Sequence, residues 1–99
     1  MSNIKTVHVM ISGHVQHVWY RGWAIKQARF LGLDGWVRNR LGGKVEAVFH
    51  GPNEQIEKML LACQDGPESA KVDEVTIARI EAGDPLQLAG QGFQRWATV

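Results

Sequence analysis

One change of hydrophobic periodicity decides the fold of this chain, and it falls on Ser12-Gly13-His14-Val15-Gln16-His17-Val18-Trp19-Tyr20-Arg21-Gly22. Residues 5–11 before this segment alternate between apolar and polar, which is typical of a half-buried strand, whereas residues 23–29 have helical spacing. A strand that breaks and resumes as a helix leaves free backbone N–H groups, which together with the helix dipole suit an anion. Arg21 adds a permanently charged guanidinium at the junction. The segment predicts a phosphate cradle; the alternative is an ordinary strand-to-helix connection with a surface arginine.

The composition is that of a small soluble domain. The 99 residues are enough for one domain with a two-layer core, and 44% apolar with 21% charged residues is ordinary for a globular chain. A net charge of +1 argues against a strongly basic nucleic-acid binder but allows a local site for a phosphorylated metabolite. Cys63 is the single cysteine, so a reducing cytoplasm is the expected compartment. We expect neither a signal peptide nor a membrane span.

The rest of the chain alternates between helical and strand periodicity. We expect a helix after Arg21 that ends at Gly32, with an apolar stripe formed by Ala24, Ile25, Ala28 and Leu31. Two strands at 33–39 and 44–51 are joined by the glycine-containing loop 40–43 and predict a hairpin. A second helix begins near Pro52, ends near Gly66, and carries the stripe Ile56, Met59, Leu60 and Cys63. A strand at 72–80, a loop at 81–92 and a short edge strand at 93–96 complete the chain.

This order of elements predicts an α/β fold of the α+β kind. Strand, helix, strand, strand, helix, strand is the order of a ferredoxin-like βαββαβ sandwich, with an antiparallel sheet and two helices on one face. In that topology the first and third strands lie side by side in the centre. The loop after the first strand and the end of the second strand then share one end of the sheet, where Arg21 and Asn39 are expected to meet.

Two motifs give the chain a resemblance to a known family. Residues 13–21 resemble the first signature of the acylphosphatase family, G-x-V-Q-G-V-x-[FY]-R, and residues 35–45 resemble the second, G-[FYW]-[AVC]-[KR]-N-x-x-x-G-x-V. The spacing between the motifs fits, as does the later Gly66-Pro67…Ala70…Val72 pattern. Two long motifs in the right order are far more specific than either one alone.

The resemblance implies an enzyme that hydrolyses an acyl phosphate to a carboxylate and inorganic phosphate, with no cofactor and no metal. Arg21 matches the arginine that binds the phosphoryl group, and Asn39 matches the asparagine that positions the attacking water. The backbone N–H groups of Val15, Gln16, His17, Val18, Trp19 and Tyr20 would hold the other phosphate oxygens. Since the carboxylate is already a good leaving group, the enzyme needs mainly charge stabilisation and alignment of water. The alternative for Asn39 is a turn residue that enters the hairpin.

One position departs from the family pattern, because His17 stands where the signature has glycine. Glycine there would suit a left-handed backbone that a β-carbon disfavours by about 1 kcal/mol or more. Three alternatives follow. The loop keeps its shape with His17 pointing outward, the loop is deformed until phosphate binds, or the chain is a binding-only relative. A protonated His17 would also assist anion binding, since histidine titrates near neutrality.

Other residue groups give weaker hypotheses. The four histidines, with His14 and His17 three apart, do not share a segment with cysteine or carboxylate ligands, so we expect no metal site. Cys63 lies on an apolar stripe and is expected in the core. Trp19 lies in the cradle and is a candidate wall for the acyl group. Arg38 and Arg40 flank Asn39 and either add positive field at the site or are ordinary exposed arginines.

A rival hypothesis is a noncatalytic ferredoxin-like domain that binds a phosphorylated ligand or a partner protein, in the event that His17 disrupts the cradle. The expected partners of an enzyme are a small-molecule acyl phosphate and inorganic phosphate as product. Neither nucleic acid nor a membrane is expected as a partner, and a monomer is the default oligomeric state.

Overall fold

A central strand, β1 (Ile4–His14), organises the sheet of this protein, as seen in a computed structural model that describes residues 3–99. The sheet has the order β4-β1-β3-β2-β5, so β1 is paired along both edges, antiparallel to β3 and to β4. The other elements are α1 (Tyr20–Phe30), β2 (Asp34–Asn39), β3 (Val45–Pro52), α2 (Asn53–Asp65), β4 (Lys71–Ala82) and β5 (Phe93–Arg95). This is the ferredoxin-like arrangement that the element order predicts.

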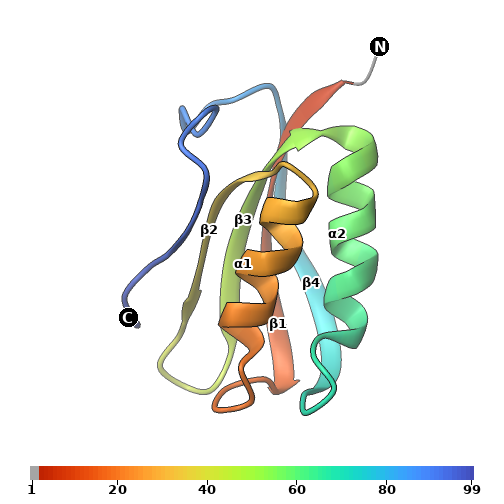
Figure 1. The fold of residues 1–99 in the computed structure, drawn as a ribbon. Helices are drawn as coiled ribbons and strands as arrows, with labels where there is room; N and C mark the ends of the chain where they lie inside the picture. Colours follow the sequence, from red (N-terminus) through yellow and green to blue (C-terminus); the bar gives the residue numbers. More distant parts are fainter. Residues whose placement is uncertain (1–2) are drawn as a thin grey trace.

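The edge strand β5 makes the sheet mixed rather than purely antiparallel. Strands β4, β1, β3 and β2 pair antiparallel as predicted, whereas β5 runs parallel to β2 through Gly35↔Phe93 and Val37↔Arg95. The segment between β4 and β5 crosses the sheet from one edge strand to the other (Figure 1). It crosses at the end of the sheet where β4 finishes, and β5 starts at that same end. It therefore runs opposite to β4 and parallel to β2.

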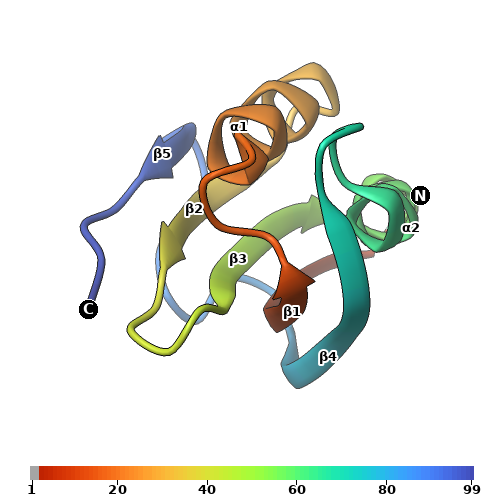
Figure 2. The same cartoon turned by 90° about the horizontal axis from the view of Figure 1, so that it is seen from below.

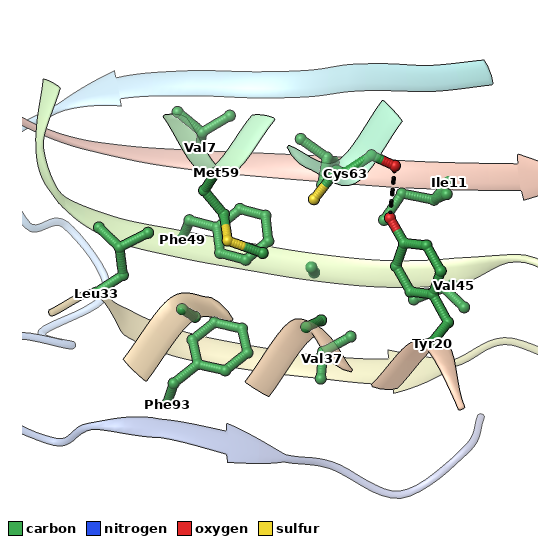
Figure 3. Packing of buried hydrophobic residues seen from close by; sticks show 14 of the residues in the cluster. Val7, Ile11, Tyr20, Leu33, Val37, Val45, Phe49, Met59, Cys63 and Phe93 are labelled. Atoms are coloured by element: carbon green, nitrogen blue, oxygen red, sulfur yellow. Dashed lines mark hydrogen bonds between the residues drawn. The ribbon is translucent and has the colours of Figure 1, made fainter. Parts of the chain in front are cut away.

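Both helices pack on the same face of the sheet, which makes two layers (Figure 2). Val7, Val9 and Ile11 of β1 are completely buried beneath them, as the alternation predicts. The predicted stripe of α2 is buried at Ile56, Met59 and Cys63, while Leu60 is partly buried against the core. Figure 3 shows this packing, in which Phe49 of β3 stacks on Phe93 of β5 with 5.4 Å between ring centroids. Each such side chain contributes about 1.5–3 kcal/mol through removal from water.

The segment 83–92 crosses one end of the open face of the sheet (Figure 1). Leu88 of this segment is buried together with Trp36 of β2 and Val48 of β3. The Asp84 carboxylate accepts hydrogen bonds from the N–H groups of Leu88 and Ala89, at 2.7 and 2.9 Å. The Asp34 carboxylate accepts two more, from Gly90 and Gly92. These two aspartates hold the segment against the sheet although it has no regular secondary structure.

A buried ion cluster also lies on this open face and is centred on Glu46 of β3. The Glu46 carboxylate accepts hydrogen bonds from Arg38 Nε at 2.7 Å and from Arg40 Nη1 at 3.4 Å, and it pairs with His8 Nε2 at 2.6 Å. Burial raises the pKa of Glu46, but the hydrogen bonds and charges of Arg38 and His8 outweigh it and leave the pKa below its ordinary value. The cluster thus stabilises the ionised carboxylate across β1, β2 and β3.

Two element boundaries differ from those expected. Strand β1 does not end at Ser12-Gly13 but continues to His14, with an irregularity in its pairing to β4 at that point. A Cβ at Gly13 (φ 122°) would lie 2.2 Å from the Lys71 carbonyl oxygen, so glycine is what lets the two backbones approach this closely. Helix α1 begins at Tyr20, earlier than the apolar periodicity indicates, and the buried Tyr20 side chain anchors its first turn in the core.

We predict that the free energy of unfolding depends on pH through Glu46. A carboxylate with a lowered folded pKa contributes stability above its unfolded pKa of about 4.3, and this contribution is lost as the pH falls through the folded pKa. Glu46→Gln should therefore cost about 2 kcal/mol at pH 7, measured by urea unfolding, and the difference from wild type should shrink between pH 5 and pH 3.

Glu57→Gln provides the matched control, because Glu57 is exposed and, among residues 3–99, forms its one ion pair with Lys5, at 2.7 Å. It should change stability by less than about 1 kcal/mol at either pH. If the cost of Glu46→Gln were the same at pH 3 as at pH 7, the assigned role of the cluster would be wrong.

Candidate functional site

The loop between β1 and α1 and the far end of β2 enclose a cavity of about 140 Å³. Its wall is formed by Val15, His17, Trp19, Tyr20, Arg21, Gly22, Asn39 and Arg95. Figure 1 shows the loop and the β2–β3 hairpin at the same end of the sheet. The topology thus brings Arg21 and Asn39 into one cavity, as expected from the order of the elements.

The loop has a strained backbone at two positions. His17 has φ 63° and Trp19 has φ 66°, so both lie in the left-handed region that residues with a β-carbon enter at a cost of about 1–2 kcal/mol. The His17 side chain is exposed and borders the cavity. This geometry fits the first alternative for His17, in which the loop keeps the conformation that glycine would favour and the imidazole points outward.

The N-terminus of α1 opens into this loop without a cap. Trp19 is the N-cap residue, and within the described part of the chain no side chain caps it and no acidic residue lies in the first turn. The backbone N–H groups of His17 and Val18 meet no acceptor among residues 3–99. Free N–H groups and the positive end of a helix dipole together form a surface suited to an anion.

Two arginines place their charge at the cavity. Burial, and then the nearby charge of Arg95, lower the pKa of Arg21, yet its guanidinium remains protonated at neutral pH. Neither arginine forms an ion pair with a carboxylate in the described residues, and no acidic residue lines the cavity. The cavity is therefore electropositive and has no internal counter-charge.

Asn39 carries an unsatisfied buried acceptor. The residue is only 7% exposed, and its Oδ1 has no hydrogen-bond partner anywhere in residues 3–99. A buried polar atom without a partner costs about 1–3 kcal/mol. An acceptor that is kept unpaired beside a cavity with two arginines is well placed to accept a hydrogen bond from a water molecule there.

Gln16 and Val18 do not line the cavity, although the sequence places them in the cradle. The Gln16 side chain turns toward the hairpin, where Nε2 donates to the carbonyl oxygens of Arg40 and Lys44, each at 2.8 Å. It therefore ties the loop to the neck of the hairpin next to Asn39. Val18 packs against the edge of the core instead.

Tyr20 fixes the other side of the loop. Tyr20 is a lining residue of the cavity but is buried, and its hydroxyl donates to the Cys63 carbonyl oxygen at 2.8 Å (Figure 3). Burial raises the pKa of Tyr20 well above its ordinary value and raises the pKa of the Cys63 thiol to about 12. Both groups are thus neutral parts of the core, which agrees with the expectation for Cys63.

Trp19 forms an outer wall of the cavity. The residue is 58% exposed, and its ring lies over Gly22, where a Cβ would come within 2.1 Å of Trp19 Nε1. Lys26 Nζ lies 5.6 Å from the ring centroid. Trp19 thus remains a candidate contact for the acyl part of a substrate. Trp23 and Trp96 lie elsewhere, tilted against Tyr20 and stacked on Trp36, respectively.

The flanking arginines Arg38 and Arg40 do not add charge at this site, because both bind Glu46 on the other face of the sheet. The second cation at the cavity is Arg95, which sequence reasoning missed. Its position depends on the parallel pairing of β5 with β2, for which the chain has no local signal.

Within residues 3–99, no group of three or more histidine, cysteine or acidic residues could hold a metal ion. No helix in this described part of the chain is long and apolar enough to cross a membrane.

Comparison with known proteins gives consistent matches. The family model described as acylphosphatase matches residues 7–94. An acylphosphatase from Rhodospirillum rubrum is 56% identical over 81 residues, which cover 82% of this chain and 89% of that protein. One from Azorhizobium caulinodans is 47% identical over 94 residues, covering 95% and 97%. The solved acylphosphatase of Coxiella burnetii superposes with a TM-score of 0.82 at 32% identity, covering 95% of this chain and 94% of that one.

We predict opposite effects on stability when two histidines of this region are changed to glycine. His17→Gly should raise the free energy of unfolding by about 0.5–1 kcal/mol, because the relief of left-handed strain exceeds the entropy that glycine adds to the unfolded chain. His14 lies in the extended end of β1, so His14→Gly should lower stability by about 0.5–1 kcal/mol. Thermal and urea unfolding of both variants test this prediction, and destabilisation by His17→Gly would contradict it.

Proposed function

Because the chain belongs to the acylphosphatase family, it is an enzyme that hydrolyses acyl phosphates, and we propose that the reaction takes place in the cavity between the β1–α1 loop and Asn39. The observation that carries this proposal is the unpaired, buried Asn39 Oδ1 beside the uncompensated charge of Arg21. One group is an acceptor suited to a water molecule, and the other is a cation suited to a phosphoryl group.

Arg21 and the loop bind the phosphoryl group in this proposal. The planar guanidinium donates to two phosphate oxygens at once, and the free N–H groups at the start of α1 reach the others. The negative charge of the substrate is thereby distributed over fixed donors, which already have the geometry that the transition state needs. The strain at His17 and Trp19 is consistent with a loop shaped for this purpose.

Asn39 positions the water in this proposal. Its Oδ1 accepts a hydrogen bond from the water, so the oxygen lone pair points at phosphorus on the side opposite the leaving carboxylate. The water oxygen forms a bond to phosphorus while the bond from phosphorus to the acyl oxygen breaks. The electron pair leaves with the carboxylate, and a phosphate oxygen takes the proton of the water. The step needs no strong base, since the carboxylate is a weak base.

The rival hypothesis of a noncatalytic phosphate-binding domain is not favoured. Arg21 and Asn39 both line the cavity despite the histidine at position 17. The matched relatives are named as acylphosphatases over most of this chain.

The proposal assigns all positive charge at the phosphate to arginine and backbone groups, so hydrolysis is independent of a metal. The small-molecule partners of this reaction are an acyl phosphate as substrate and inorganic phosphate as product. A monomeric, cytoplasmic protein that binds neither nucleic acid nor membrane remains the expectation drawn from composition.

Substitution of the two central residues should separate binding from turnover. With benzoyl phosphate as substrate, Arg21→Ala should lose at least about 10³-fold in kcat/KM together with inhibition by inorganic phosphate, because it removes the main cation. Asn39→Ala should lose about 10²–10³-fold in kcat but retain phosphate inhibition within threefold of wild type. Equal residual activity in both variants and wild type would contradict the assignment.

Arg95 should contribute to phosphate affinity through its charge. Arg95→Gln is expected to weaken inhibition by inorganic phosphate about three- to tenfold, since one of two nearby cations is removed. The effect should diminish in high salt. Arg79→Gln is the matched control, because Arg79 lies on β4 away from the cavity, and it should leave the inhibition constant unchanged. An unaffected inhibition constant in Arg95→Gln would show that Arg95 is a bystander.

A further inference from the structure

Figure 2 shows that one face of the sheet carries no helix. A second and larger cavity is lined by side chains of this face. Its volume is about 300 Å³, more than twice that of the cavity that holds Arg21 and Asn39. It is lined by alternate residues of β1, β2 and β3, by two residues of β4, and by Leu86 from the segment that crosses this face. Its size lies at the lower end of the range for small-molecule sites. The two cavities share no residue.

The cavity has apolar and aromatic walls. Val48 forms part of its floor with only 1% of its surface exposed, and Trp36 is 7% exposed. The Trp36 ring stacks on Trp96 with 4.2 Å between centroids and an interplanar angle of 8°, which holds the indole rigidly. Leu86 lies at the rim with 56% of its surface exposed. An exposed leucine beside a fixed indole offers a surface for a flat apolar group.

The arginines and carboxylates that line the cavity are equal in number. Two arginines, Arg38 and Arg79, face two carboxylates, Glu46 and Glu81, and Arg40 binds Glu46 from outside the lining. The side chain of Glu46 is only 8% exposed and is occupied by Arg38, Arg40 and His8. Glu81 is paired with Arg79 at 3.3 Å. Neither carboxylate is available to bind a ligand cation.

Arg38 has N–H donors that are not used by the residues that the structure describes. A guanidinium has five N–H donors, and the Nε of Arg38 donates to Glu46 while its two terminal nitrogens meet no acceptor among the residues that the structure describes. The Arg38 guanidinium carbon lies 4.8 Å from the Trp36 ring centroid, so its plane is held at the wall of the cavity. An anionic group of a ligand would find unused donors there next to an aromatic surface.

We propose that this cavity binds a small organic anion with a flat apolar body, the chemical class of the aromatic carboxylates. The carboxylate is held by the free donors of Arg38, and the ring lies against Trp36 and Leu86. The site is independent of the phosphate cavity on the other side of the sheet, so occupation of one does not require the other.

Titration of the full chain with 2-naphthoate, followed by the indole N–H signals of Trp36 and Trp96 in NMR spectra, tests the proposal. 2-Naphthamide has the same shape without charge, and acetate has the charge without the ring. We expect saturable shifts of both indole signals with 2-naphthoate and at least tenfold weaker binding of the other two. Equal binding of 2-naphthoate and 2-naphthamide, or no saturation by 2-naphthoate, would overturn the proposal.

Leu86 is exposed, so charged substitutions there do not disturb the core. A pair of variants with opposite charge at this position tests whether the cavity prefers an anionic ligand. Leu86→Glu should weaken 2-naphthoate binding at least tenfold, whereas Leu86→Lys should preserve or strengthen it.

Arg21→Ala and saturating inorganic phosphate should both leave the binding of 2-naphthoate unchanged. Loss of binding in Arg21→Ala, or displacement by phosphate, would place the ligand in the phosphate cavity and refute a second site. Equal effects of Glu and Lys at position 86 would refute anion recognition.

Discussion

The double pairing of β1 is the constraint on which the rest of the structure depends. Because β1 bonds to β3 on one edge and to β4 on the other, its backbone cannot shift without breaking two ladders. Val7, Val9 and Ile11 add a completely buried face, so a register slip of one residue would turn this apolar set toward water. The loop that follows β1 therefore starts from a fixed point, and the close approach of β4 at Gly13 secures that point further.

The cavity beside Arg21 and Asn39 gathers several features that the rest of the fold must stabilise. His17 and Trp19 are held in left-handed conformations, and among residues 3–99 no side chain caps the start of α1 and no group pairs with the buried Asn39 Oδ1. Each of these features is unfavourable by itself. They persist because Gln16 ties the loop to the hairpin and Tyr20 ties it to the Cys63 carbonyl. The unsatisfied groups converge on one cavity, where a substrate can satisfy them.

Successive side chains of β2 point to opposite faces of the sheet, so Asn39 and Arg38 contribute to two different sites. Val37 and Asn39 point toward the helices, and Trp36 and Arg38 point to the open face, since side chains of a strand alternate. Asn39 thereby lies beside Arg21, whereas Arg38 binds Glu46 although it is adjacent in sequence. The same rule explains why the positive charge of the cavity beside Asn39 comes from Arg21 and Arg95 and not from the arginines that flank Asn39.

The sequence by itself determined the order of the elements, the buried faces of β1 and α2, and the meeting of Arg21 with Asn39, because periodicity and the two long motifs are local properties of the chain. Only the tertiary structure decided the parallel pairing of β5, the placement of Arg95 at the cavity and the capture of Arg38 and Arg40 by Glu46. It also showed that Gln16 holds the hairpin rather than lining the cavity. These features depend on contacts between residues far apart in the chain, which no local pattern encodes.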